Sequence, residues 1–313
     1  MAAPPASPSF VERQLPQGGE IFLDHVAHFV PGEAAAADAM RRAGFAPTPA
    51  SVQSNPGPNG TTILTGTSNI TAMMTRGYIE ILFKSSNSPL TREFDDGLTR
   101  YPGLHLMAFS VADATAASLR LNGEGFRTAP IVALRRPVGT ESGETEAAFT
   151  VARVLPGEMR EGRIQYLTHH TEDAVWQKRW LTHPNGANAL VDVVAVVDDV
   201  DEAAARYVRF LGREAVTTNM GRGIFLDRGG VQLVNRASFG GLMANLPAPA
   251  LPFIGLCAVR VTSLDVAERS LRSHSVAYEK RGKLLAVPMP QGLGTGAWFF
   301  VERAGDLPWR AQS

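Results

Sequence analysis

The sequence predicts an α+β fold of four βαβββ modules, paired into two sheet-lined halves. Three observations predict this fold. Apolar, strand-like stretches recur four times, an amphipathic helical segment follows each of them, and further strand-like segments follow each helix. One module cannot bury its sheet alone. We therefore expect two modules to pair and to enclose a cavity between their concave faces.

Each repeat opens with a stretch rich in Val, Phe, Leu and Ala. These stretches are FLDHVAHFV at 22–30, GLHLMAFSV at 103–111, LVDVVAVVD at 190–198 and IGLCAVRVT at 254–262. The first three helical segments end at Gly44, Gly125 and Gly212, residues suited to the left-handed conformation that stops a helix, and Ser275 stands at the fourth end. Each stop lies at nearly the same distance from its strand, which favours a diverged repeat.

Two or three strands are expected after each helix. The first repeat predicts TTILTG, NITAMM and YIEILF as separate strands, and the second predicts EAAFTVARVL and RIQYLTHH, with IVALRRPV as a further candidate. GIFLD and VQLVN follow in the third repeat, and KLLAVPM and AWFFVER in the fourth. Turn residues in HPNGAN at 183–188 predict a boundary between the pairs. We expect a disordered tail over 1–19, a first pair over 20–186 and a second over 187–313.

Composition and charge exclude several classes of function. Lys plus Arg and Asp plus Glu number 30 each, so the net charge is zero. The sequence has no basic stripe of the kind that binds phosphates, so nucleic acid is not an expected partner. The single cysteine, Cys257, excludes an internal disulfide and fits a reducing compartment. We see neither a signal peptide nor an apolar run long enough to span a membrane, so we expect a cytoplasmic protein. The expected partner is a small molecule, and a homodimer is among the expected assemblies.

The opening strand carries two histidines in an apolar setting. Because side chains alternate along a strand, His25 and Phe29 are expected to face the cavity, and Asp24 and His28 to face the helix side. His25 is thus a candidate for metal or substrate contact, with a hydrogen-bonded structural histidine as the alternative. For His28 the structural interpretation is favoured.

Glu80 lies among apolar neighbours in YIEILF. A buried carboxylate needs a metal, a cation or a proton, and a buried salt bridge is the alternative. Its counterpart in the second module is Gln165 in RIQYL, whose carbonyl oxygen is a weaker ligand. Aligning the opening strands puts Leu106 at the position of His25. His105 is one residue away and is expected to face the helix unless a bulge shifts the register.

Further histidines follow Gln165. His169 shares its face of the strand and is a candidate replacement ligand or substrate-binding base, whereas His170 faces the other way. His183 either reaches the cavity from the connecting loop or has a cap or turn role. For Trp176 and its neighbour Trp180, helix packing is favoured over a substrate rim.

Three motifs of the first half resemble the vicinal oxygen chelate superfamily, and within it the glyoxalase-like proteins. The motifs are LDHVAHFV, GYIEILFKSSNSPL and GLHLMAFSVAD, and the stretch from TVARVLPGEMREG to WLTHPNGA is similar to one in bacterial members. The resemblance covers about residues 20–303. It implies paired modules around a cavity, and usually one divalent metal that chelates an oxygenated substrate. It also implies His25 and Glu80 as ligands.

Two functions remain open. The first is a metal-dependent lyase, isomerase or dioxygenase that binds a small oxygenated compound by bidentate chelation to a divalent metal, with Zn, Fe, Mn and Ni as candidates. The alternative is a metal-free protein that sequesters a small molecule, which Leu106 favours; a structural or regulatory subunit is a third reading. The candidate residues are His25, Glu80 and Gln165 as metal ligands, Glu80 and His169 as catalytic groups, and Phe29, Gln165 and His105 as substrate contacts.

The second half carries a different set at the four equivalent positions. The residues are Asp192, Gln232, Leu256 and Phe299, which cannot hold a metal in the usual way. We therefore expect side chains to fill the second cavity. The open cavity is expected within residues 20–186, lined by His25, Phe29, Glu80, Gln165 and His169.

Overall fold

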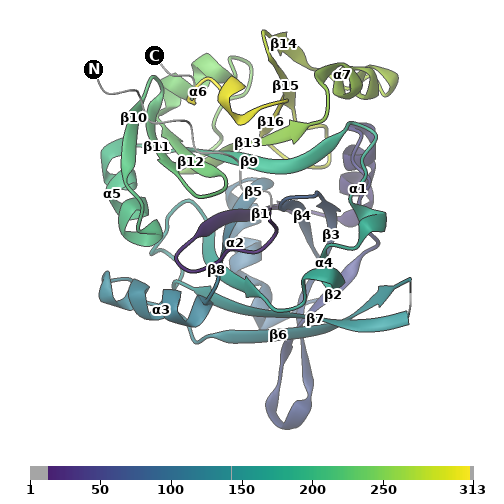
Figure 1. Ribbon diagram of the computed structural model, residues 1–313, viewed down its shortest axis with the longest axis vertical. Coiled ribbons are helices and arrows are strands. Elements are labelled where there is room, and N and C mark those ends of the chain that lie inside the picture. The colour runs from purple at the N-terminus through teal and green to yellow at the C-terminus, as the bar shows by residue number, and fades with distance from the viewer. Residues whose placement is uncertain (1–12, 142, 311–313) are drawn as a thin grey trace.

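The computed structural model describes residues 13–141 and 143–310 and confirms four βαβββ modules (Figure 1). The first contains β1 (Ile21–Val30), α1 (Glu33–Arg42), β2 (Ser51–Pro56), β3 (Thr62–Met73) and β4 (Tyr78–Lys84). The second contains β5 (Gly103–Val111), α3 (Ala114–Gly123), β6 (Val132–Thr140), β7 (Gly143–Arg153) and β8 (Arg163–His169). The third contains β9 (Ala187–Val196), α5 (Val200–Leu211), β10 (Ala215–Thr218), β11 (Gly221–Phe225) and β12 (Gly230–Val234). The fourth contains β13 (Phe253–Val261), α7 (Leu264–Ser273), β14 (Glu279–Arg281), β15 (Leu284–Pro288) and β16 (Ala297–Val301).

The modules pair through their opening strands. β1 and β5 run antiparallel, which gives the first half the strand order β2-β3-β4-β1-β5-β8-β7-β6. β9 and β13 pair in the same way, and the second half has the order β10-β11-β12-β9-β13-β16-β15-β14. A short pairing of Leu104 with Ile254 joins β5 to β13. Each half is thus a curved sheet of two modules.

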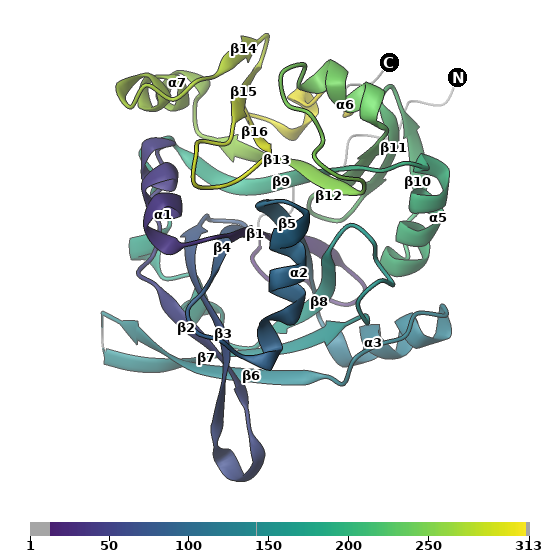
Figure 2. The same ribbon diagram turned by 180° about the vertical axis from the view of Figure 1, so that it is seen from behind.

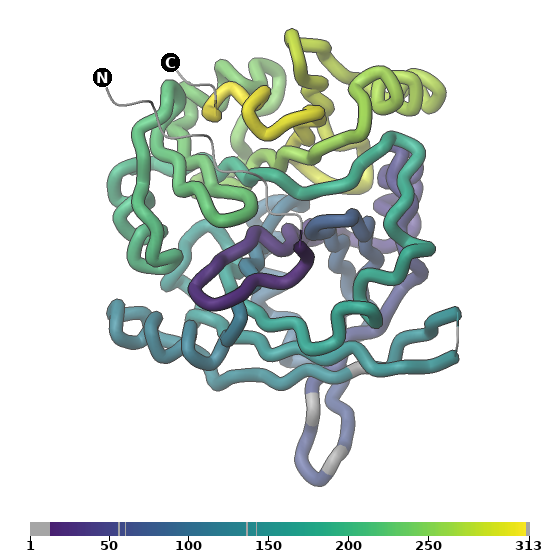
Figure 3. The backbone as a smooth tube through the Cα atoms, viewed as in Figure 1, coloured from purple at the N-terminus to yellow at the C-terminus, as the bar shows by residue number. Residues whose placement is uncertain are grey.

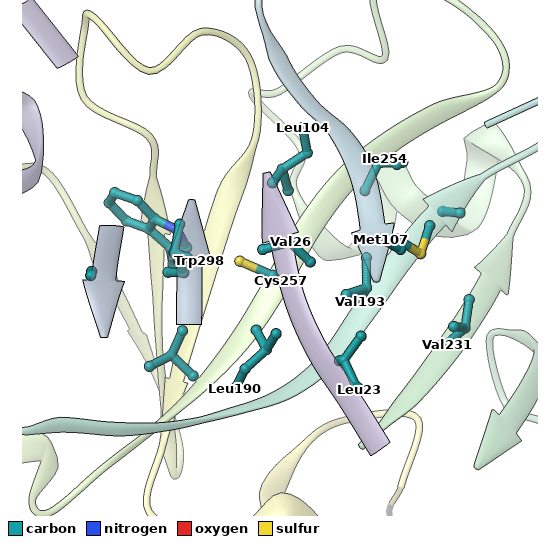
Figure 4. Packing of buried hydrophobic residues seen from close by; sticks show 14 of the residues in the cluster. Leu23, Val26, Leu104, Met107, Leu190, Val193, Val231, Ile254, Cys257 and Trp298 are labelled. Atoms are coloured by element: carbon teal, nitrogen blue, oxygen red, sulfur yellow. The ribbon is translucent and has the colours of Figure 1, made fainter. Parts of the chain in front are cut away.

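The main core lies between the two halves, where their convex faces meet (Figure 4). Leu23 and Val26 of β1 pack there with Val193 of β9, Cys257 of β13 and Trp298 of β16, all fully buried. Helices α1, α3, α5 and α7 contribute apolar residues to the same cluster. Each such side chain stabilises the fold by about 1.5–3 kcal/mol on burial. The concave faces therefore point away from each other.

The stops of the four repeated helices match the sequence pattern. Gly44, Gly125 and Gly212 have φ values of 82°, 84° and 62°. Ser275, at the fourth end, has a φ of 53° although it carries a Cβ. The backbone conformation of the repeat is therefore kept where the favoured residue type is not.

Two helices between modules were not predicted, α2 (Arg92–Arg100) and α6 (Arg236–Leu242). Figure 2 shows α2 in front of the first half. Phe94 of α2 packs against Phe29 with ring centroids 4.9 Å apart, and Phe239 of α6 packs against Phe253 at 5.7 Å. Each helix therefore covers part of one concave face. None of the helices in the described ranges is long and apolar enough to cross a membrane.

One strand assignment in the first module was wrong. TTILTG and NITAMM both belong to β3, and the missing strand is β2, SVQSNP. Gly66 lies within β3 at a φ of 86°, opposite a register shift between Val52 and Ser54. A Cβ on Gly66 would come within 2.7 Å of Thr91 Cγ2. This glycine thus marks a bulge in a continuous strand instead of the turn that we expected. Figure 3 shows the resulting long hairpin projecting from the first half.

Part of the expected N-terminal tail is ordered. Residues 1–12 of that tail lie outside the described residues. Beyond them, the fully buried Arg228 donates hydrogen bonds to the carbonyl oxygens of Arg13 (2.6 Å) and Gln14 (3.2 Å). A buried guanidinium needs acceptors, and the segment that we expected to be disordered supplies them.

Candidate functional site

The concave face of the first half encloses a cavity of about 670 Å³, a volume that suits a small ligand. One group of lining residues is apolar: Leu82, Phe94, Leu106, Leu134, Phe149, Val151 and Leu167. A second group is ionisable: His25, Glu80, Arg92, Glu93, Asp96, Arg135, Arg153 and Arg163. The cavity thus combines an apolar wall with several charges.

The four positions singled out by the repeat all line this cavity: His25, Glu80, Leu106 and Gln165. The registers show why. Parallel pairing places Glu80 opposite Ala27, two residues after His25, and Gln165 opposite Ala108, two residues after Leu106. The two modules therefore present equivalent positions to one space.

A bulge in β1 changes the expected direction of Asp24. The pairing with β5 shifts between Leu23 and His25, so strict alternation fails at Asp24. Leu23 and Val26 both pack in the core between the halves, whereas the Asp24 carboxylate bonds to His25. Our expectation that Asp24 faces the helix side was wrong for this reason.

Asp24 bridges two histidines. His25 Nδ1 donates to Asp24 Oδ1 at 2.7 Å, and His169 Nε2 donates to Asp24 Oδ2 at 2.9 Å. Burial alone would raise the pKa of Asp24, but His169 and His25 outweigh it and hold that pKa well below its usual range. The His25 ring also stacks on Tyr78 at 4.3 Å. His25 is therefore fixed with Nε2 as its free ring nitrogen.

Glu80 is held in a similar way from its far side. Its Oε1 accepts hydrogen bonds from Asn69 Nδ2 at 2.5 Å and Gln53 Nε2 at 3.1 Å. Its Oε2 lies 3.9 Å from His25 Nε2. This separation exceeds a hydrogen bond, so two oriented donor atoms face each other across a gap.

The other two positions offer less to a metal. Gln165 Oε1 accepts a hydrogen bond from Arg153 Nε at 3.0 Å, and Leu106 has no donor atom. Within residues 13–141 and 143–310, no group of three or more His, Cys, Asp or Glu side chains is placed to hold a metal ion. Two donor atoms therefore fit an ion, His25 Nε2 and Glu80 Oε2, while Gln165 Oε1 is bound by Arg153. The remaining positions would be open to substrate oxygens.

Three candidate residues lie behind the cavity wall. Phe29 packs under α2, and His169 has a fully buried side chain whose ring contacts Trp176. His105 lies at a second bulge, opposite a shift between Ala27 and His28, and its ring is 5.2 Å from Phe29. None of the three is a lining residue of the cavity. Direct substrate contact was expected for each, and packing against neighbouring rings accounts for the difference.

His105 has its own partners beneath α2. Its Nε2 donates to the Tyr101 carbonyl oxygen at 2.6 Å, and the two rings stack at 4.1 Å. Burial lowers the pKa of His105 to about 4. It is therefore a neutral, structurally bound imidazole at neutral pH.

Two other histidines also have structural partners. His28 Nδ1 donates to the Leu293 carbonyl oxygen at 3.1 Å, and burial lowers its pKa to about 4. His183 accepts from the Ala46 backbone N–H at Nδ1 and donates from Nε2 to the Met73 carbonyl oxygen. Both bonds anchor the loop before β9 to the first module.

Side chains fill the concave face of the second half. Its four equivalent positions are all fully buried: Asp192, Gln232, Leu256 and Phe299. The Asp192 carboxylate accepts from Arg310 Nε at 2.6 Å, from Arg310 Nη2 at 2.7 Å and from Trp309 Nε1 at 2.8 Å. The C-terminal segment thus occupies the space that corresponds to the first cavity.

Solved structures share this architecture at low sequence identity. A hypothetical protein from Staphylococcus aureus has a TM-score of 0.60 and 9% identity, over 90% of this chain and 98% of that one. A mutant of 4-hydroxymandelate synthase from Streptomyces coelicolor has a TM-score of 0.55 and 13% identity, over 90% of this chain and 92% of that one. A xylose isomerase-like TIM barrel/4-hydroxyphenylpyruvate dioxygenase fusion protein has a TM-score of 0.51 and 12% identity, over 95% of this chain and 51% of the fusion. These likenesses show the fold.

Sequence comparison supplies the family. No curated protein matches the chain significantly. The family profile described as a glyoxalase-like domain matches residues 23–211, which is more than half of the chain. The chain therefore belongs to the glyoxalase-like domain family.

Proposed function

We propose that the chain is an enzyme of the lyase, isomerase or dioxygenase type that transforms a small oxygenated compound in the first-half cavity. A divalent ion would be held there by His25 and Glu80, whereas the Gln165 carbonyl oxygen, expected as a third ligand, is bound by Arg153. Zn, Fe, Mn and Ni are the candidates. Bound there, the ion would supply Lewis-acid polarisation of a substrate oxygen.

One observation carries this proposal. His25 Nε2 and Glu80 Oε2 face each other across 3.9 Å, while the other polar atom of each side chain is held from behind. A carboxylate on the far ring nitrogen is the usual support of a metal-binding histidine, because it fixes the tautomer and the orientation of the ring. Such supports cost conformational freedom and are expected where a ligand needs a preorganised site.

The chain's own residues have separate roles in this proposal. Asp24 orients His25 and keeps the Nε2 lone pair directed at the cavity. Glu80 is also the group that would take up a proton from the substrate when its Oε2 is not bound to the ion, since this oxygen accepts no hydrogen bond from the described residues. The amides of Asn69 and Gln53 hold its other oxygen, Oε1, in place. His169 acts through Asp24 and is therefore a positioning residue.

A metal-free binding protein is the second candidate. Leu106 supplies no ligand, and Arg153 occupies the oxygen of Gln165. With these two positions unavailable, the cavity would retain a small molecule against its apolar wall without reacting with it.

Elemental analysis separates the two candidates. The protein should be purified without chelators or a metal-affinity tag, and then reconstituted with Zn, Mn, Fe or Ni in turn. We expect close to one ion per chain in at least one case, and a strong loss of bound metal in His25→Ala and in Glu80→Ala. His28→Ala removes a histidine of the same strand that faces the core, and should retain the metal.

The outcome is decisive in both directions. Stoichiometric metal that depends on His25 and Glu80 supports the enzyme. A wild-type protein that holds no stoichiometric metal after all four reconstitutions supports the binding protein instead.

A further inference from the structure

Arg153 places a positive charge in the cavity wall and forms no ion pair with a carboxylate of the described residues. Its side chain is partly buried and lines the cavity. Within the described ranges its side chain makes one hydrogen bond, from Nε to the neutral Gln165. Burial and the neighbouring Arg163 lower its pKa, Glu93 and Glu80 partly offset them, and the resulting pKa of about 10 leaves the group a cation at neutral pH. Its terminal Nη groups therefore remain available to a ligand.

The neighbouring charges are already engaged. Arg163 donates from Nε to Glu93 Oε2 at 2.9 Å, and its Nη2 lies 2.8 Å from the same oxygen. The Arg163 guanidinium also lies 5.5 Å from the centre of the Phe29 ring. Glu80 is bound by two amides and faces His25. Arg153 is therefore a cation of this wall that has no bonded counter-charge among the residues that the structure describes.

The residue opposite Arg153 explains why the charge is left over. Arg153 of β7 pairs with Gln165 of β8, at the position where the first module has Glu80. A glutamate at 165 would form an ion pair with Arg153 and neutralise it. A glutamine holds Nε by a hydrogen bond and leaves the charge in place. The fork of the guanidinium matches the two oxygens of a carboxylate.

We propose that Arg153 and Gln165 form a subsite for the carboxylate group of the substrate, so that the natural substrate is an anionic carboxylic acid. The apolar residues Leu134, Phe149 and Val151 then receive its hydrocarbon part. The inference rests on the proposed function only in taking this cavity as the substrate site. It needs neither turnover nor a bound metal.

The test compares acids with their neutral amides on metal-stripped protein. Phenylacetate and phenylacetamide form one pair of probes, and hexanoate and hexanamide form the other, with binding measured by isothermal titration calorimetry. We expect at least one acid to bind the wild type about tenfold or more tightly than its amide, because a charge-assisted pair is lost in the amide. Arg153→Met should abolish this preference, and so should Gln165→Glu, which supplies an internal counter-charge.

Arg92→Met is the matched control, because Arg92 lies at the cavity with an exposed side chain that is already near Asp96. It should keep the preference for the acid. Equal binding of acid and amide in the wild type would overturn the proposal, as would a preference that survives in Arg153→Met. Should Arg153→Met fail to fold, Gln165→Glu decides alone. A wild-type protein that binds no stoichiometric metal yet prefers the acids would refute the proposed function and support this subsite.

Discussion

The two halves of the molecule have the same topology and different interiors. Both pair their modules through antiparallel opening strands, and both carry a register shift at the same two places, so that Val191 corresponds to Asp24 and Gly255 to His105. The first half encloses a cavity with His25 and Glu80 in its wall, whereas the second is filled. Backbone geometry alone therefore does not make a site. The identity of a few inward side chains decides whether the space holds a ligand or a core.

The largest effect on stability is expected at Asp192, which pairs with Arg310 at the position equivalent to His25. Asp192→Ala leaves Arg310 without its carboxylate in the interior and should lower the free energy of unfolding by about 3–5 kcal/mol, measured by chemical denaturation. A double variant, Asp192→Leu with Arg310→Met, should recover much of that loss. If Asp192→Ala were neutral, the second interior would be looser than its contacts indicate.

A matched pair of leucines compares the two interiors directly. Leu256→Ala opens a void in a filled core and should cost about 3–5 kcal/mol in unfolding free energy. Leu106→Ala, at the equivalent position, borders the existing cavity and should cost about 2 kcal/mol or less, because water and neighbouring side chains can enter the space. Equal losses in denaturant titrations would contradict the contrast between an open and a filled half.

The support of His25 gives a smaller effect that belongs to the first half alone. Asp24→Asn weakens the hold on the ring and should lower metal affinity by about 10–100-fold, which corresponds to about 1.4–2.7 kcal/mol. Metal competition titrations measure it. Asp192→Asn, which changes the other half, serves as the control and should leave the affinity unchanged. An Asp24→Asn protein with wild-type affinity would remove Asp24 from the site.

Acid sensitivity should also originate in the first half. His28 and His105 have pKa values lowered to about 4, so the unfolded chain, with histidine pKa values near 6.5, binds more protons between these limits. The two buried, neutral imidazoles contribute fully to the stability of the folded state above about pH 6.5. This contribution is lost as the pH falls toward 4. Each contributes a slope of up to about 1.4 kcal/mol per pH unit to the unfolding free energy.

His28→Asn and His105→Gln test this assignment. Both substitutions keep an N–H donor near the position of the native one and remove the titration. The double variant should show a flatter pH dependence of denaturation in this window. An unchanged slope would place the acid-sensitive groups elsewhere.

Much of the fold could be predicted because the signal repeats. The four opening strands and the helix stops at Gly44, Gly125, Gly212 and Ser275 follow from local pattern. The helix α2 was missed because REFDDGLTR is polar and buries mainly Phe94. Its place depends on the concave face that it covers, which is tertiary information.

The site could be predicted only in part. Alternation placed His25, Glu80 and Gln165 in the cavity wall. It failed at Asp24 and His105, because bulges arise from pairing between strands distant in the sequence. Arg153 was missed because its contact with Gln165 depends on the register of β7 and β8. The hairpin-like spacing of these two strands was the signal that would have paired them.

The core between the convex faces makes each half depend on the other for the burial of its apolar residues. The second half, whose interior is filled by side chains, still covers the convex face of the first half, since Leu23 and Val26 pack against Val193 and Cys257. Deleting the second half would expose the apolar core between the convex faces to water. The second half is therefore required as the packing partner of the first, independently of what its own interior binds.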